Sequence, residues 1–98
     1  MEAKPLKALL ADRNVSFDAT TILNALVKSG HAENSEYAST TGSGQLKSFK
    51  RLTESGMQFG TNKSTMHPLK TEPRFYEETF PELLKVVVTQ LHHEVTSL

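Results

Sequence analysis

Four histidines are the residues most able to do chemistry, because a neutral imidazole binds metal ions and transfers protons near pH 7. His92 and His93 are neighbours in the chain, so on a helix their side chains would point about 100° apart and could not chelate one ion. His31 and His67 lie in polar segments without metal-ligand spacing, and the chain has no cysteine. No serine or threonine stands at a spacing that singles out a nucleophile and its base. We therefore expect solvated histidines, no metal, no cofactor and no enzymatic activity.

Basic residues give a stronger functional signal, although 11 basic and 11 acidic residues leave the whole chain without net charge. Between Gly44 and Arg74, six basic residues stand against two acidic ones. The residues predicted to hold nucleic-acid phosphates are Lys47, Lys50, Arg51, Lys63, Lys70 and Arg74. Phe49 would pack or stack beside them. The alternative is an ordinary solvated surface or a contact with a protein partner, which the zero net charge favours.

Two helices are predicted in the first third of the chain to position this surface. Residues 4–12 form the first, with Pro5 in its first turn and leucines along one face. Residues 16–29 form the second, which begins after Ser16 or Asp18 as N-cap and stops at Gly30. The pair has the outline of a helix–turn–helix, although any helical hairpin would show the same pattern.

A β-hairpin is predicted over residues 36–52, with the glycine-rich segment 42–44 as its turn. Segment 42–44 lacks the Lys-Ser/Thr ending of a phosphate-binding loop, so turn chemistry explains it. A short helix is expected over residues 53–60. Residues 61–73, which contain two prolines, are predicted to be a loop, and residues 74–80 a short extended or turn segment.

The last helix is predicted over residues 81–97, with Thr79 or Phe80 at its cap and Pro81 in its first turn. Apolar residues spaced four and three apart form a short heptad seam on it. The residues predicted to mediate self-association are Leu84, Val88, Leu91 and Val95. Because the seam covers fewer than three heptads, packing of this helix on its own domain remains the favoured alternative to a homodimer.

One stretch, residues 41–84, resembles the C-terminal regions of phage antirepressors and related regulatory proteins of phages and mobile elements. The resemblance is carried by Leu52-Thr53-Glu54-x-Gly56, Phe59-Gly60-x-Asn62, Tyr76-Glu77 and Phe80-Pro81-Glu82-Leu83-Leu84, preceded by a helix with Asn24-Ala25-Leu26 and Ser29-Gly30. It implies a small winged-helix-like module, a phage or mobile-element origin and a regulatory role. It implies no catalytic site.

These observations predict an α+β fold and a single winged-helix-like domain over residues 1–98. Helix 16–29 and hairpin 36–52 would form a surface that binds DNA or modulates a DNA-bound regulator. The alternative is a protein-interaction module that binds no nucleic acid, such as an inhibitor or adaptor of a host complex, with Phe75, Tyr76 and Phe80 as exposed anchors. The chain has neither a signal-peptide core nor an apolar run near the roughly 20 residues of a membrane helix, so a cytoplasmic location is expected.

Overall fold

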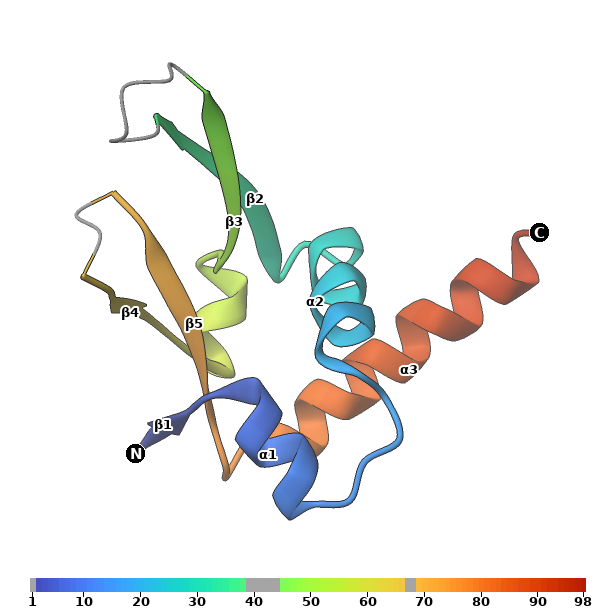
Figure 1. Ribbon diagram of the computed structural model, residues 1–98. Helices are drawn as coiled ribbons and strands as arrows, with labels where there is room; N and C mark the ends of the chain where they lie inside the picture. The colour runs from blue at the N-terminus through green and yellow to red at the C-terminus, as the bar shows by residue number, and fades with distance from the viewer. Residues whose placement is uncertain (1, 39–44, 67–68) are drawn as a thin grey trace.

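The computed structural model describes residues 2–38, 45–66 and 69–98, which form an α+β fold. In chain order the elements are β1 (Ala3–Lys4), α1 (Leu6–Asp12), α2 (Ala19–Lys28), β2 (Ala32–Ala38), β3 (Leu46–Leu52), the 3-10 helix η1 (Ser55–Gln58), β4 (Gly60–Ser64), β5 (Thr71–Tyr76) and α3 (Phe80–Thr96). The strands make two antiparallel sheets, one ordered β1-β5-β4 and the other formed by the β2–β3 hairpin. Both sheets lie on one side of the molecule and the three α-helices on the other (Figure 1).

Helix α1 buries its three leucines in the core, as its sequence pattern predicts. Its start differs from the prediction, because Ala3 and Lys4 pair with Tyr76 and Phe75 of β5 as a short strand. Pro5 therefore stands at the N-cap instead of inside the first turn. The helix ends before Asn14, whose φ of 52° lies in the left-handed region that asparagine tolerates better than most residues.

Helix α2 begins and ends on the expected signals. Asp18 is its N-cap, with the carboxylate accepting a 2.7 Å hydrogen bond from the Thr21 amide. Ile22, Ala25 and Leu26 follow at helical spacing and are buried. Gly30 has a φ of 85° and ends the helix, because residues with a Cβ are strained in this conformation.

The predicted β-hairpin is present and longer than expected, since β2 begins at Ala32. Its register pairs Ala32 with Leu52 at the base and Ala38 with Leu46 at the far end. The base residues Ala32 and Leu52 are buried, whereas Leu46 is 63% exposed. The predicted turn at residues 42–44 lies outside the described residues.

The prediction of a loop over residues 61–73 is wrong, because β4 pairs with β5 through most of this segment. Of the two prolines that suggested a loop, Pro73 lies in β5 and Pro68 lies outside the described residues. The Tyr76 amide donates a hydrogen bond to the carbonyl of Phe59, which directly precedes β4, so this amide points toward β4. Since amides alternate sides along a strand, the Pro73 nitrogen points away from β4, toward an edge that β1 does not reach. Its missing N–H therefore removes no ladder hydrogen bond.

The side-chain amide of Asn62 in β4 links the two sheets, because it hydrogen-bonds both backbone groups of Leu52 as a neighbouring strand would. Its side-chain oxygen accepts from the Leu52 amide at 2.8 Å, and its side-chain nitrogen donates to the Leu52 carbonyl at 3.0 Å. Between β3 and β4, the chain forms the 3-10 helix η1 where the sequence predicted a short helix over residues 53–60. Gly56 in η1 lies so close to the His31 carbonyl that a Cβ there would clash with it. Only glycine therefore fits at this position.

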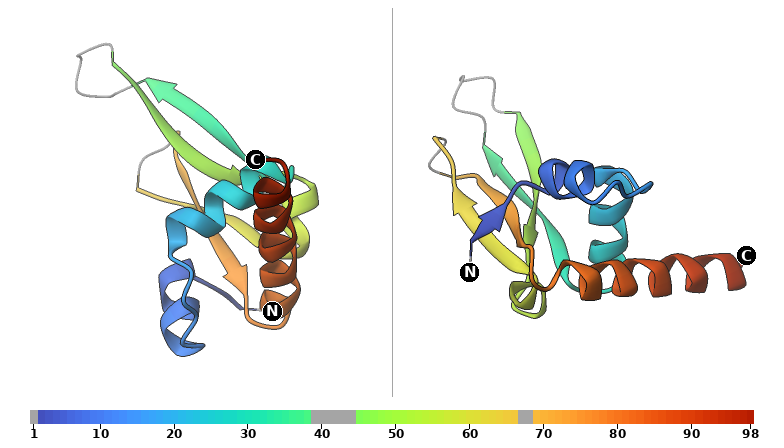
Figure 2. Two further views of the ribbon diagram at one scale, coloured as in Figure 1. Left: turned by 90° about the vertical axis from the view of Figure 1, so that its right-hand side faces the viewer. Right: turned by 90° about the horizontal axis from the view of Figure 1, so that it is seen from below.

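Helix α3 closes the core with Phe80, Leu83 and Val87, which join buried residues of α1, α2 and both sheets in one cluster. Thr79 is the N-cap, although its side chain makes no capping hydrogen bond. Lys28 at the end of α2 donates to Glu94 at 2.8 Å. The C-terminal end of α3 extends past the other elements (Figure 2).

Candidate functional site

The six basic residues predicted to contact phosphates divide into two groups in the structure. Arg51 Nε lies 3.4 Å from the Glu33 carboxylate on the neighbouring strand, and Arg74 Nη2 lies 2.6 Å from that of Glu72. Each arginine is therefore already paired with a carboxylate. Within residues 2–38, 45–66 and 69–98, no carboxylate lies within ion-pairing distance of the other four. These four unpaired lysines are Lys47, Lys50, Lys63 and Lys70.

Lys50 and Lys70 come together at one pocket of about 400 Å³, which Phe49 also lines. Lys50 and Phe49 belong to β3 of the hairpin, whereas Lys70 immediately precedes β5 of the other sheet. Lys47 and Lys63 do not line this pocket. The tertiary fold thus brings two lysines from different sheets to one pocket, which the strand pattern of 46–52 alone does not predict.

The remaining walls of this β3–β5 pocket are partly apolar and partly hydroxylated. Leu23 of α2 and Pro73 of β5 contribute carbon surface, and Ser48 and Thr71 contribute hydroxyl groups. Glu72 is the acidic residue of the lining, and Arg74 contacts its carboxylate through a hydrogen bond from Nε and an ion pair from Nη2. Because that carboxylate is already paired, the lysines give the pocket a positive potential.

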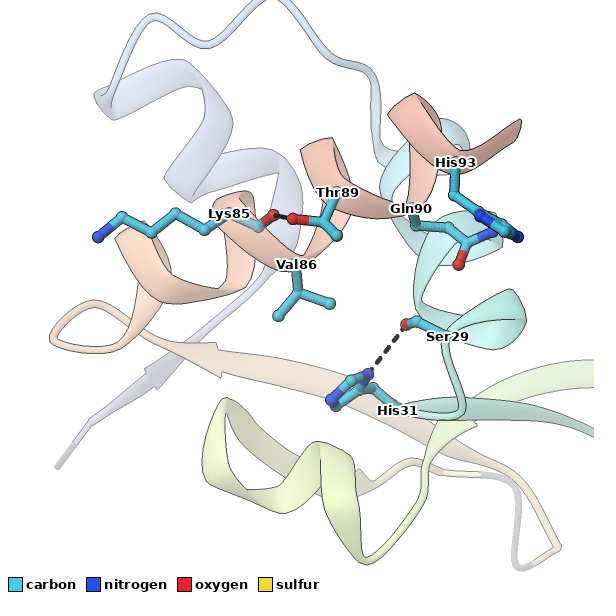
Figure 3. Close-up of a pocket in the computed structure, with 7 residues that line it drawn as sticks. All are labelled: Ser29, His31, Lys85, Val86, Thr89, Gln90 and His93. Atoms are coloured by element: carbon cyan, nitrogen blue, oxygen red, sulfur yellow. Dashed lines mark hydrogen bonds between the residues drawn. The ribbon is translucent and has the colours of Figure 1, made fainter. Parts of the chain in front are cut away.

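A second pocket of about 530 Å³ lies between the end of α2 and α3 (Figure 3). It contains a serine–histidine contact that sequence spacing did not reveal, with Ser29 Oγ 2.9 Å from His31 Nδ1. Ser29 also donates to the Leu26 carbonyl at 3.1 Å, as part of the C-terminal cap of α2. A hydroxyl has one proton, so Nδ1 must then be the donor and cannot act as a base toward Ser29. The contact therefore fits a helix cap better than a nucleophile.

The histidines do not form a metal site within the described part of the chain, where no three His, Asp or Glu residues gather closely enough. His31 packs its ring against Phe59, with centroids 5.5 Å apart. His92 and His93 are exposed on α3, and His67 lies outside the described residues.

The predicted self-association seam of α3 is divided between the core and solvent. Leu84 and Leu91 are partly buried against the core. Val88 and Val95 are 50% and 65% exposed, and with these leucines they form an apolar stripe beside the buried face. The seam prediction did not distinguish these two environments, because both repeat at the same helical spacing.

The prediction that Phe75, Tyr76 and Phe80 are exposed anchors is wrong for the two phenylalanines. Phe75 is 0% and Phe80 1% exposed, and both belong to the core. Phe75 faces inward because β5 is flanked by β1 and β4, and Phe80 because it begins the buried face of α3. Only Tyr76 is half-buried.

Among the described residues, every helix is too short or too polar to cross a lipid bilayer. The chain matches no known protein family, no curated protein and no solved structure.

Proposed function

We propose that the protein binds nucleic acid through the four unpaired lysines, with the β2–β3 hairpin acting as the wing of a winged-helix-like arrangement that follows α2. The observation that carries this proposal is the convergence of Lys50 and Lys70, from different sheets, on one pocket beside Phe49. Lysine clusters of this kind neutralise phosphates and release bound counterions. The proposed regulatory role in a phage or mobile element rests on the resemblance of residues 41–84 to antirepressor regions.

The charge pattern sets a limit on the salt dependence. If all four unpaired lysines contact phosphates, log affinity falls with log salt by about 0.9 per phosphate on duplex and about 0.7 on a single strand. Between about 50 and 200 mM salt, affinity would then fall by roughly 50- to 150-fold. A smaller fall would mean that fewer lysines engage phosphates.

The test is fluorescence anisotropy of labelled duplex and single-stranded DNA with the double variant Lys50→Ala/Lys70→Ala. It should bind both probes more weakly and reduce the salt slope by about 1.4 to 1.8, since two contacts are lost. The matched control is Lys7→Ala/Lys85→Ala, which removes the same charge from exposed positions on α1 and α3. Equal behaviour of the two double variants would contradict the proposal.

The second candidate is a protein-interaction module that binds no nucleic acid. The observation that favours it is the apolar stripe of α3, on which Val88 and Val95 are half or more exposed. Exposed aliphatic residues in a row are typical of surfaces that another protein covers. A second copy is the occupant we would test first, by sedimentation equilibrium of the wild-type protein. A homodimer that binds neither DNA probe at low salt would favour this candidate over the first.

A further inference from the structure

We propose that the end of the β4–β5 hairpin is an apolar wedge that inserts Met66 and Leu69 between base pairs of a duplex and bends it, while Lys63 and Lys70 hold the flanking phosphates. This inference rests on the proposed nucleic-acid binding and deepens it, because it assigns how a duplex is engaged. The unpaired lysines account for attraction to phosphates, whereas the wedge accounts for two exposed aliphatic side chains that charge alone does not require.

These two aliphatic side chains gather at one end of the hairpin. Met66 lies shortly after β4 and is 104% exposed, and Leu69 lies shortly before β5 and is 57% exposed. An exposed fraction near 100% means that the Met66 side chain contacts almost no other residue, so it contributes nothing to the core. Large apolar side chains that gather at one exposed place, unlike single scattered ones, are typical of a surface that another molecule covers.

The strands behind this end form a hydrogen-bonded ribbon that is anchored in the core. Strand β5 pairs with β4 along the whole length of β4, and the Thr65 hydroxyl donates to the Lys70 carbonyl at 2.9 Å just beyond the last pair. At the base of the ribbon, Phe75 is 0% exposed. The two aliphatic residues therefore follow directly on a supported ribbon, which can carry them into a groove.

Lysines stand close behind the wedge on both strands. Lys63 belongs to β4 and Lys70 precedes β5, and within the described part of the chain neither has a carboxylate within ion-pairing distance. The register places Glu72 opposite Lys63, but Arg74 is already paired with that carboxylate. Cations behind an apolar tip match the order of groups in a duplex groove, where phosphates line the rims and base pairs form the floor.

The charge distribution of the molecule turns the hairpin side toward a polyanion. Residues 32–38, 45–52, 60–64 and 69–76 contain six basic and three acidic residues, whereas residues 77–98 contain one basic and four acidic residues. Both hairpins project on the same side of the molecule, away from the C-terminal end of α3 (Figures 1 and 2). A duplex is therefore attracted to the hairpin side and repelled by α3.

The type of apolar residue favours a duplex over a single strand. Single strands are bound through flat aromatic rings that stack on bases, whereas methionine and leucine are among the side chains that proteins insert between base steps from the minor groove. Such insertion partly unstacks one step and kinks the duplex by roughly 20–90°. The cost of unstacking is lower where the step is already weakened, as at a mismatch. A wedge should therefore bend DNA and prefer a weakened step.

The experiment compares the full-length wild-type protein with the double variant Met66→Ser/Leu69→Ser on duplexes of about 20 base pairs that differ only in a central mismatch. A dye at each end reports bending by energy transfer, and anisotropy reports affinity. The matched control is Met57→Ser/Leu98→Ser, which makes the same two changes at exposed positions in η1 and after α3. Thermal melting of each variant shows that it is folded.

We expect the wild-type protein to bind the mismatched duplex about tenfold more tightly than the paired one and to raise energy transfer on both. Met66→Ser/Leu69→Ser should lose this preference and the rise in energy transfer, yet keep the salt slope, because its lysines are unchanged. The control variant should behave as the wild type.

The results that would overturn the inference differ in what they leave standing. A double variant that retained the preference and the bend would exclude the wedge, and so would a wild-type protein that bound both duplexes equally without bending them. Either result leaves salt-dependent binding through the lysines intact. Failure of the wild-type protein to bind either duplex at low salt would exclude both proposals. Binding to phosphatidylserine vesicles that requires Met66 and Leu69, with no bend in DNA, would assign this end to a lipid surface instead.

Discussion

Asn62→Ala is the substitution that most directly tests how the two sheets are held together. The side-chain amide of Asn62 makes one hydrogen bond to the Leu52 amide and one to the Leu52 carbonyl. Removing it leaves both backbone groups without their partner at a residue whose side chain is 1% exposed. The hairpin base would then lose both of these hydrogen bonds to β4.

The cost follows from these two bonds. A typical protein hydrogen bond contributes about 1 kcal/mol net, so two contribute about 2 kcal/mol if water replaces the amide. If water does not enter, each backbone group left unsatisfied costs about 1–3 kcal/mol, and the loss is larger. For a chain of this size, 2 kcal/mol lowers the melting temperature by roughly 8–16 °C.

Thermal unfolding followed by circular dichroism measures this loss, with Gln58→Ala as control. The Gln58 amide donates one hydrogen bond to the Ser55 carbonyl at an exposed site, so we expect a loss below about 1 kcal/mol. Asn62→Asp keeps the shape but turns a carboxylate oxygen toward the Leu52 carbonyl. It should be destabilised at neutral pH and partly recover in acid, where the protonated carboxyl donates. If Asn62→Ala melted no lower than Gln58→Ala, this amide would not be the link between the sheets.

Two further predictions concern the helices. Hydrogen bonding from Thr21 lowers the pKa of Asp18, so the stability that this carboxylate contributes is present above its unfolded pKa and is lost as pH falls through its folded pKa. Asp18→Asn keeps a capping oxygen but does not titrate, so the melting temperature of this variant should depend less on acid than that of the wild type. Identical acid profiles of the two proteins would contradict this. The double variant Val88→Asp/Val95→Asp changes two exposed positions of α3, so we expect its melting temperature to be almost unchanged. If the wild type is a homodimer, sedimentation equilibrium should show that the variant has lost the dimer. A dimer that persisted would exclude this stripe as its interface.

The helices were the most predictable part of the fold, because their signals are local. Asp18 and Gly30 bracket α2 through a cap and a left-handed turn, both of which depend on a few neighbouring residues. The buried face of α3 was less predictable. Its true core positions, Leu83 and Val87, lie next to the seam that the heptad spacing singled out, and only the packing of α3 against α2 and the rest of the core distinguishes them.

The second sheet and the pocket could not be predicted from local patterns. Strand β4 is polar and β5 contains Pro73, so neither shows the alternation that indicates a strand. Their pairing depends on contacts along the ladder, and the attachment of this sheet to the hairpin depends on Asn62; sequence spacing reveals neither. Lys50 and Lys70 were both among the predicted phosphate-binding residues, yet their convergence depends on this sheet. The pairing of Arg51 with Glu33 likewise follows from the hairpin register, which the sequence left open.

The measurement that tests the central claim most directly is the affinity of the wild-type protein for labelled single-stranded and duplex DNA at about 50 and 200 mM salt. The account predicts binding of both probes that weakens over this range by up to about 50-fold for the single strand and up to about 150-fold for the duplex. No binding of either probe at the lower salt concentration, or binding that does not change with salt, would contradict it.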